Sequence, residues 1–218
     1  MSSATHLKIA VLPLARPTFD VPFAEETCRN AWDLLEQLPA EWTGTRDLLF
    51  DAGAVETRLK EMVKDPPDLL LVMQLTFTDA TMTVKLAETL DAPMLFWSFP
   101  EERSGGRLRL NSLCGINLAS HALGKSGIRC DYLHIHPQDE RALTELQARI
   151  SAHHARKNLS CTRLAVLGQH PDGFHTCAYD AQELKKMAGV TVDQLELNDL
   201  FEEANQVSPT QVEALQQE

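Results

Sequence analysis

The chain has 218 residues, of which 44% are hydrophobic, and its formal net charge is −11. This length and hydrophobic content are enough for a substantial core in one large domain, or in one domain and part of another. The negative charge argues against nucleic acid or a membrane surface as a partner, because phosphate-rich surfaces would repel the protein. We therefore expect a globular protein.

The cysteines and the apolar runs indicate where such a protein works. Five cysteines are scattered along the chain without a C-x-x-C pair, which is typical of reduced thiols in the cytoplasm. No apolar run approaches the ~20 residues of a transmembrane helix. The opening residues 1–17 match a first buried strand better than a signal peptide. The sequence predicts a cytoplasmic protein.

The chain begins with an alternation of strand and helix patterns. Residues 8–14 predict a buried strand, and two prolines stiffen the loop 15–23 that follows it. Apolar residues at helical spacing predict a helix over 24–38, which Pro39 ends. A second strand is predicted over 45–50 and an amphipathic helix around 55–63. This order favours βαβ units.

Residues 68–99 form the central unit of the pattern. Residues 68–75 are a near-continuous apolar run, as in a parallel strand that is covered on both faces. Thr78 or Asp79 can cap a following helix with Met82 on its apolar face, and a strand is predicted over 94–99. The loop 74–79 therefore lies at the carboxyl end of a central strand. Ligands bind at that edge of open parallel sheets.

The later elements define the domain organisation. A helix over 111–126, a strand over 129–136 and a polar helix over 138–158 complete the first cycle. The sequence predicts a doubly wound, flavodoxin- or Rossmann-like α/β domain with a parallel sheet of about five strands in residues 1–137, and a connecting helix in 138–160.

Residues 161–218 are predicted to begin a second α/β domain that is incomplete. Strands are expected over 164–167 and 190–197, with a helix over 181–188 between them and two short helices after them. Two strands alone are marginal in water, so this part must extend the first sheet, pair with another chain or continue elsewhere. An unfinished lobe would expose apolar surface at both strands.

Motifs for nucleotides, metals and nucleophilic catalysis are missing or weak. There is no G-x-G-x-x-G or Walker pattern, which disfavours nucleotide binding. The sequence around histidines 134, 136, 170 and 175 does not indicate the three or four converging donors that a metal site needs, so we expect them to be structural or solvated. Ser120 and His121 are adjacent and point apart on a helix. Cys114 is expected to pack as a small apolar residue.

Polar and aromatic residues gather instead in the loops at the carboxyl ends of the strands. Arginines 103, 107 and 109 surround Gly105-Gly106, in a segment suited to an anionic or hydroxylated ligand. The other loops add the mixture expected at a sugar or polyol site, with local caps and ion pairs as the alternative explanation. The residues are Arg16, Phe19, Asp20, Gln74, Thr76, Phe77, Asp79, Trp97, Asn111, Asn117 and His121.

Four segments in order resemble a known family. They are LPLARPTFDVPFAEE, QLTFTDATM followed by LDAPMLFWSFPEE, GGRLRLNSLCGINLASHAL, and GFHTCAYDAQELKKMAGV. The chain resembles the N-terminal part of the L-fucose/L-arabinose isomerase superfamily, in particular its fucose isomerase-like branch. The resemblance implies aldose–ketose isomerisation through an enediol with a divalent metal, usually Mn²⁺, held by two acidic residues and a histidine. It places those ligands in a region that this chain does not reach, so no catalytic residue, metal ligand or cofactor is expected here.

The same resemblance implies an oligomer in which the N-terminal domain of one subunit covers the substrate of another. It assigns that role to Arg16, Phe19, Phe77, Met82, Asn117 and His121. Arabinose isomerases carry glutamine where this chain has Leu118, which argues against arabinose as the substrate. The expected partners are a sugar or polyol, and either further copies of the chain or a chain that supplies the catalytic region.

Three functions follow from these observations. The first is the substrate-covering and oligomerisation portion of a sugar isomerase, inactive by itself because enediol chemistry needs a base and a polarised carbonyl. The second is a stand-alone carbohydrate-binding or regulatory module, which would bind sugar without turnover even beside a metal-bearing partner. The third is an enzyme with an unrelated site, which metal-dependent turnover by the chain alone would support.

Overall fold

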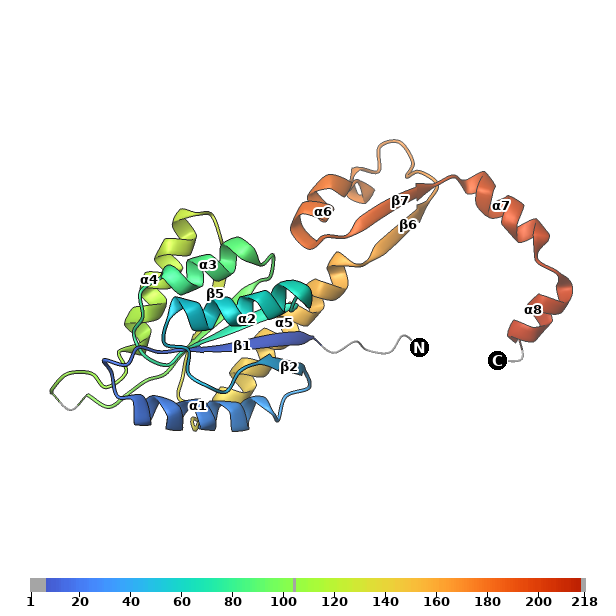
Figure 1. The fold of residues 1–218 in the computed structure, drawn as a ribbon. Coiled ribbons are helices and arrows are strands. Elements are labelled where there is room, and N and C mark those ends of the chain that lie inside the picture. The colour runs from blue at the N-terminus through green and yellow to red at the C-terminus, as the bar shows by residue number, and fades with distance from the viewer. Residues whose placement is uncertain (1–6, 104, 217–218) are drawn as a thin grey trace. The chain divides into compact units, whose positions relative to one another are not determined.

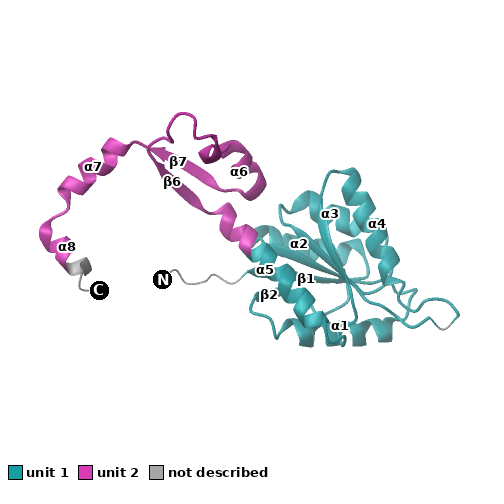
Figure 2. Cartoon of the chain, turned by 180° about the vertical axis from the view of Figure 1, so that it is seen from behind, with its two compact units in different colours: residues 1–154 teal, residues 155–218 magenta. Residues whose placement is uncertain are grey.

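The structure is a computed structural model that describes residues 7–103 and 105–216 (Figure 1). The chain divides into two compact units, Met1–His154 and Ala155–Glu218 (Figure 2). The division falls inside a long helix, Ala142–Ser160. None of the described helices is long and apolar enough to cross a membrane.

Unit 1 is a doubly wound α/β domain, as predicted. Its five strands are all parallel and lie in the order β2-β1-β3-β4-β5. Along the chain the elements are β1 (Lys8–Leu14), α1 (Val21–Leu35), β2 (Glu41–Gly44), α2 (Ala52–Lys64), β3 (Leu69–Gln74), α3 (Thr81–Thr89), β4 (Met94–Ser98), α4 (Ser112–Lys125), β5 (Cys130–His134) and α5 (Ala142–Ser160).

Helices cover both faces of the sheet (Figure 1). Alternate residues of β1 point to opposite faces: Val11 packs with α1 and α5, and Leu12 packs with α2, α3 and α4. Every residue of the central strand β3 is buried. The near-continuous apolar run at 68–75 therefore arises from burial on both faces, as predicted.

The predicted second strand over 45–50 is wrong. The strand that pairs with β1 is β2, which ends at Gly44, where φ is +99°. Residues 45–50 follow as a loop in which Leu49 makes a single bridge to Leu14 and is 5% exposed. Leu48, Leu49 and Phe50 at the end of this loop pack against the core, and their burial gave the segment the composition of a strand.

Several helix starts also differ from the predictions, and those of α1 and α3 show the physical reason. Helix α1 begins three residues early, because the Asp20 carboxylate accepts the Phe23 N–H and Pro22 fits the first turn. Helix α3 begins after Ala80, which has no capping side chain. The Asp79 carboxylate accepts the Thr81 N–H. Asp79 therefore binds the first turn of α3 as expected, but from the residue before the N-cap position.

Unit 2 is a small strand–helix–strand unit followed by two helices, as predicted. Strands β6 (Arg163–Leu167) and β7 (Thr191–Leu195) are parallel neighbours. Between them lie a 3₁₀ turn (His175–Cys177) and α6 (Ala181–Ala188), and α7 (Leu197–Gln206) and α8 (Pro209–Gln216) follow. The Asp180 carboxylate caps α6, which ends at Gly189 with φ +75°.

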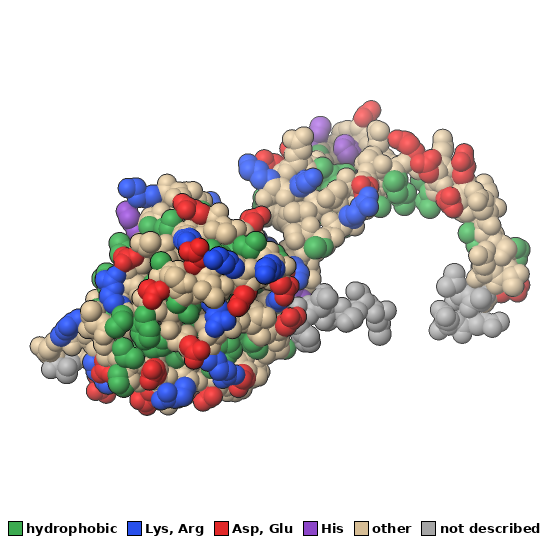
Figure 3. Space-filling view, in the orientation of Figure 1, with side chains coloured by type: hydrophobic (Ala, Val, Ile, Leu, Met, Phe, Trp, Pro, Cys, Tyr) green, Lys and Arg blue, Asp and Glu red, His purple; other side chains and the backbone are tan. Residues whose placement is uncertain are grey.

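Unit 2 carries most of the exposed large apolar side chains of the described residues, although it is the smaller unit. Leu164, Leu167, Leu195 and Leu197 are 41–47% exposed, which confirms the expectation for both strands. Val190 differs, at 5%, and it is the one apolar residue of the buried class among the described residues of unit 2. On unit 1, by contrast, charges of both signs are interspersed over the face seen in Figure 3.

Candidate functional site

The strand order places a switch point between β1 and β3. The chain leaves β1 toward β2 on one side and returns through β3 on the other, and in open parallel sheets ligands bind outside the carboxyl ends of the strands at such a point. The loop after β4 joins the loops after β1 and β3 through the backbone: Asp20 N donates to Arg109 O at 3.1 Å, and Phe77 N donates to Leu110 O at 2.8 Å. Three loops thus form one structure at this edge.

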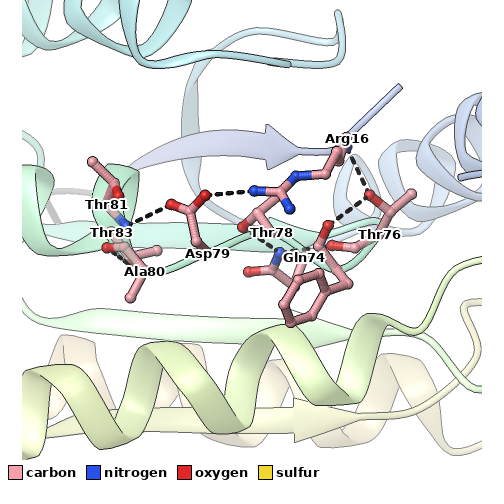
Figure 4. A network of polar contacts seen from close by, with 9 residues as sticks. Arg16, Gln74, Thr76, Thr78, Asp79, Ala80, Thr81 and Thr83 are labelled. Carbon is pink, nitrogen blue, oxygen red and sulfur yellow. Dashed lines mark hydrogen bonds and ion pairs between the residues drawn. The ribbon is translucent and has the colours of Figure 1, made fainter. Parts of the chain in front are cut away.

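Arg16 is held in place at the switch point (Figure 4). Its backbone N–H donates to Thr76 Oγ1 at 2.7 Å, and its guanidinium donates to the Asp79 carboxylate at 2.5 Å. The guanidinium lies 5.6 Å from the centre of the Phe77 ring. Hydrogen bonds from Thr81 first, and the Arg16 charge next, lower the pKa of Asp79, so this carboxyl is ionised at neutral pH. Arg16 is therefore preorganised.

Arginine–aromatic pairs surround Arg16. The rings of Phe19 and Phe77 are 6.2 Å apart. Arg107 lies 5.0 Å from the Phe19 ring centre and donates to Thr18 O at 3.0 Å. Arg109 lies over the Phe23 ring and donates to the Asp20 carboxylate at 2.8 Å. We call this set the rim: Arg16, Phe19, Phe77, Asp79, Arg107 and Arg109.

The rim offers the two kinds of contact that a sugar uses. Aromatic rings cover the C–H face of a sugar ring, and fixed guanidinium and carboxylate groups hydrogen-bond to hydroxyls. The ion pairs Arg16–Asp79 and Arg109–Asp20 hold these groups in position. The same ion pairs could also be purely local caps and pairs that only stabilise the loops. That alternative does not explain why arginines stack on aromatic rings in loops at this edge of the sheet.

Gln74 and Thr76 were expected to be ligand-binding groups, but in the structure they hold the loop after β3 in shape. Both are fully buried. Gln74 Nε2 donates to Thr76 O at 2.7 Å and to Thr78 Oγ1 at 2.9 Å, so the side chain braces the loop that carries Phe77. Gly115 of α4 makes room for it, since a Cβ there would lie 2.8 Å from the Gln74 amide.

A cavity of about 410 Å³ lies beside the rim, at the carboxyl ends of β4 and β5 and the start of α4. Ser98 Oγ and His134 Nδ1 are 2.8 Å apart at its edge, and burial lowers the pKa of His134. The lining is mixed polar and apolar: Phe99, Pro100, Glu101, Arg103, Leu108, Asn111, Ser112, Leu113, Cys114, Asn117 and His134. We refer to this space as the cavity.

Glu101 shapes the loop between the rim and the cavity. Its carboxylate accepts backbone N–H groups of Arg109, Leu110 and Asn111 at 2.5, 3.0 and 2.6 Å. Asn111 has φ +51°, the one positive value of a non-glycine residue among the described residues. The carboxylate thus fixes the turn from which α4 starts.

The six residues assigned to substrate covering lie in different places. Arg16, Phe19 and Phe77 are together in the rim. Asn117 lines the cavity, and His121 is exposed on α4 one turn beyond it. Met82 is 6% exposed and packs in the core with α2 and α4.

Sequence reasoning missed several groups at this edge. The expectation that Cys114 packs as a small apolar residue is wrong: it is exposed and lines the cavity, because α4 turns Gly115, Ile116 and Ala119 inward. The role of Glu101 and the stacking of Arg107 on Phe19 depend on contacts between residues that are far apart in the sequence. The sequence feature that pointed to this loop was the arginine-rich segment 103–109. Among the described residues, no three His, Cys, Asp or Glu side chains are grouped to hold a metal.

The sheet order is flavodoxin-like, and the rim lies at the switch point, where α/β domains with this order commonly bind ligands. Comparison with known protein families shows which family the chain belongs to. Residues 10–156 match the fucose/sulfoquinovose isomerase N-terminal domain, and the chain belongs to this family. The resemblance to fucose isomerase-like proteins is thereby confirmed.

Curated relatives are similar over almost the whole chain. It is 30% identical over 201 residues to a sulfoquinovose isomerase of Alkalicoccus urumqiensis, covering 92% of this chain and 45% of the relative. It is 30% identical over 196 residues to one of Priestia megaterium, covering 89% of this chain and 44% of the relative. The chain spans less than half the length of these relatives.

Proposed function

We propose that this chain is the N-terminal, substrate-covering and subunit-contacting portion of an aldose–ketose isomerase. The observation that carries the proposal is the rim, which stands at the switch point of a family domain and holds Arg16 between Asp79 and Phe77. Such a rim can close over a sugar whose reacting carbons are held elsewhere. Its contribution is to bind, orient and shield the substrate from water.

The proposed substrate is a sugar of the class named for the relatives, sulfoquinovose or a related aldose. Isomerisation moves a proton between two adjacent carbons through an enediol. The family resemblance assigns this chemistry to a divalent metal, with Mn²⁺ as our expectation. The described residues of this chain do not fit such a site. We therefore assign the rim only to substrate contact and derive no step through the metal.

The proposed partner of unit 2 is polypeptide equivalent to the half of the relatives that this chain does not match. A pair of strands is marginal alone, and Leu164, Leu167 and Leu195 are more than 40% exposed. Such polypeptide would cover them and bring the metal ligands. We further propose that the assembly is a homo-oligomer in the cytoplasm, where the five free cysteines stay reduced.

A stand-alone sugar-binding module is the second candidate. Unit 1 forms both the rim and the cavity from its own residues, so neither requires unit 2 for its construction. This function predicts saturable sugar binding that is never followed by turnover. A reconstitution experiment separates it from the first proposal.

The rim is tested in an assembly of the full chain with the unmatched C-terminal part of the Alkalicoccus urumqiensis relative, supplied with Mn²⁺ and sulfoquinovose. Arg16→Ala and Phe77→Ala are each expected to lower kcat/KM about tenfold, because each removes a group that contacts the substrate. The matched control is Arg58→Ala, since Arg58 pairs with Glu61 on α2 and lies near Lys8 at the amino end of β1. Rim variants as active as this control would contradict the proposed role.

A further inference from the structure

We propose that the chain by itself catalyses the interconversion of the α and β anomers of a cyclic aldose in the cavity, with His134 as the group that carries the proton. The inference goes beyond the proposed function, because the exchange of anomers needs neither a metal nor the part of the relatives that this chain does not match. It rests on the proposed function only for the choice of an aldose as the substrate.

The imidazole of His134 is held by Ser98, which is fully buried at the end of β4. The Ser98 Oγ lies 2.8 Å from His134 Nδ1, and the two residues are paired in the sheet. The Ser98 hydroxyl donates to Leu133 O at 3.4 Å, so its oxygen can accept a hydrogen bond from Nδ1–H. This arrangement keeps the ring proton on Nδ1 and leaves the lone pair on Nε2.

His134 Nε2 is the available base of the cavity. The side chain is accessible to solvent and lines the cavity, and Nε2 has no hydrogen-bond partner among the described residues. Partial burial lowers the pKa of His134 more than hydrogen bonding to Ser98 raises it, which keeps the imidazole in its basic form at neutral pH. The Glu101 carboxylate lines the same space, but it already accepts three backbone N–H groups.

The rest of the lining suits an uncharged sugar ring. The volume of about 410 Å³ falls in the range of small-molecule sites. Asn111 and Asn117 supply amides that can donate to hydroxyls and accept from them, and Phe99 and Leu113 supply apolar surface for the C–H groups. A sugar in the cavity therefore finds polar and apolar contacts beside the imidazole.

The reaction is a proton transfer that opens and closes the sugar ring. Nε2 takes the proton of the hydroxyl on C1, and the bond between C1 and the ring oxygen breaks with its electron pair on that oxygen. A carbonyl forms at C1, and the imidazolium gives the proton to the ring oxygen. One nitrogen can serve both oxygens, because both are bonded to C1. Closure on the other face of the carbonyl reverses these transfers and gives the other anomer, with no further reactant.

The test is anomer exchange by the purified 218-residue chain in EDTA, with freshly dissolved α-D-glucose or α-L-fucose, followed by ¹H NMR of the anomeric signals. For at least one sugar, the chain should exceed the rate of free imidazole at the same concentration by about a hundredfold or more, because the base is positioned. His134→Ala and His134→Gln should each lose about a hundredfold, although glutamine keeps a polar side chain beside Ser98. The control is His170→Ala, which removes an exposed histidine of unit 2.

The outcomes separate this inference from the proposed function. A chain no faster than free imidazole with both sugars, or a His134→Gln variant as fast as His170→Ala, would overturn the anomer-exchange activity. Aldose–ketose turnover by the reconstituted assembly would then still support the isomerase proposal. Conversely, anomer exchange that depends on His134, beside an assembly without aldose–ketose turnover, would support this inference and contradict the proposed function.

Discussion

Gly44→Ala is expected to lower the free energy of unfolding by about 3 kcal/mol or more, because two independent penalties meet at this residue. Gly44 has φ +99°, a conformation that residues with a Cβ rarely adopt. A Cβ at Gly44 would also lie 2.2 Å from the carbonyl oxygen of Val11 in the neighbouring strand. That oxygen belongs to the backbone of a central sheet and cannot move aside as a flexible side chain would.

The effect of Gly44→Ala is measured by urea unfolding followed by circular dichroism. Gly106→Ala is the matched control, because a Cβ at Gly106 would meet no atom within 4 Å and its φ is not positive. The control should change the free energy of unfolding by less than about 1 kcal/mol. A similarly small change for Gly44→Ala would contradict the structure at the end of β2.

The same glycine explains the error in the predicted second strand. The apolar residues at 48–50 suggested a strand over 45–50, but the continuous pairing with β1 ends at Gly44, and Leu49 then makes a single isolated bridge to Leu14. Composition reports that a segment is buried, and it does not report which backbone groups are paired. The strand ends where a positive φ turns the chain, and a lone glycine in the sequence does not reveal its φ.

Ser112→Ala is expected to lower the free energy of unfolding by about 2 kcal/mol and to disturb the cavity. Ser112 is 1% exposed, and its hydroxyl bridges Phe99 N–H after β4 and Gln74 O at the end of β3. Alanine would leave the Phe99 N–H buried without an acceptor. The start of α4, which lines the cavity, would lose its connection to both strands.

The Ser112→Ala effect is read from the same unfolding experiment, with hydrogen exchange at the Phe99 amide as a second observable. Ser120→Ala serves as the control, since the Ser120 hydroxyl lies 3.6 Å from Cys130 Sγ and is only partly buried. Its change should be within about 0.5 kcal/mol. A Ser112 variant as stable as the Ser120 variant, with unchanged exchange at Phe99, would show that the bridge does not stabilise this edge.

The sequence predicts where the candidate site lies better than it predicts which side chains line it. A parallel sheet brings the carboxyl ends of its strands to one edge, so identifying β1, β3 and β4 is enough to bring Arg16, Phe19 and Phe77 together. Whether a loop residue faces solvent or core is decided by packing. Gln74 turned inward against Gly115, and Cys114 turned outward, for reasons that only the positions of neighbouring elements supply.

Unit 2 was predictable for a different reason. The strand, helix and strand patterns are local, and the Asp180 cap and Gly189 end mark α6 in the sequence itself. The same locality left the strands exposed, because a short unit with two strands has few partners for its apolar side chains. No local sequence pattern shows which polypeptide covers the exposed apolar side chains of β6 and β7.

Aldose–ketose interconversion can be assayed with the purified 218-residue chain and added Mn²⁺, across a panel of sulfoquinovose, L-fucose, D-arabinose and L-arabinose. We expect no turnover by the chain alone, and turnover when the unmatched C-terminal part of a relative is added. Sugar binding without turnover in the mixture would instead favour the stand-alone module. Metal-dependent turnover by the chain alone would contradict the proposed substrate-covering role, because a complete catalytic site would then lie within these residues.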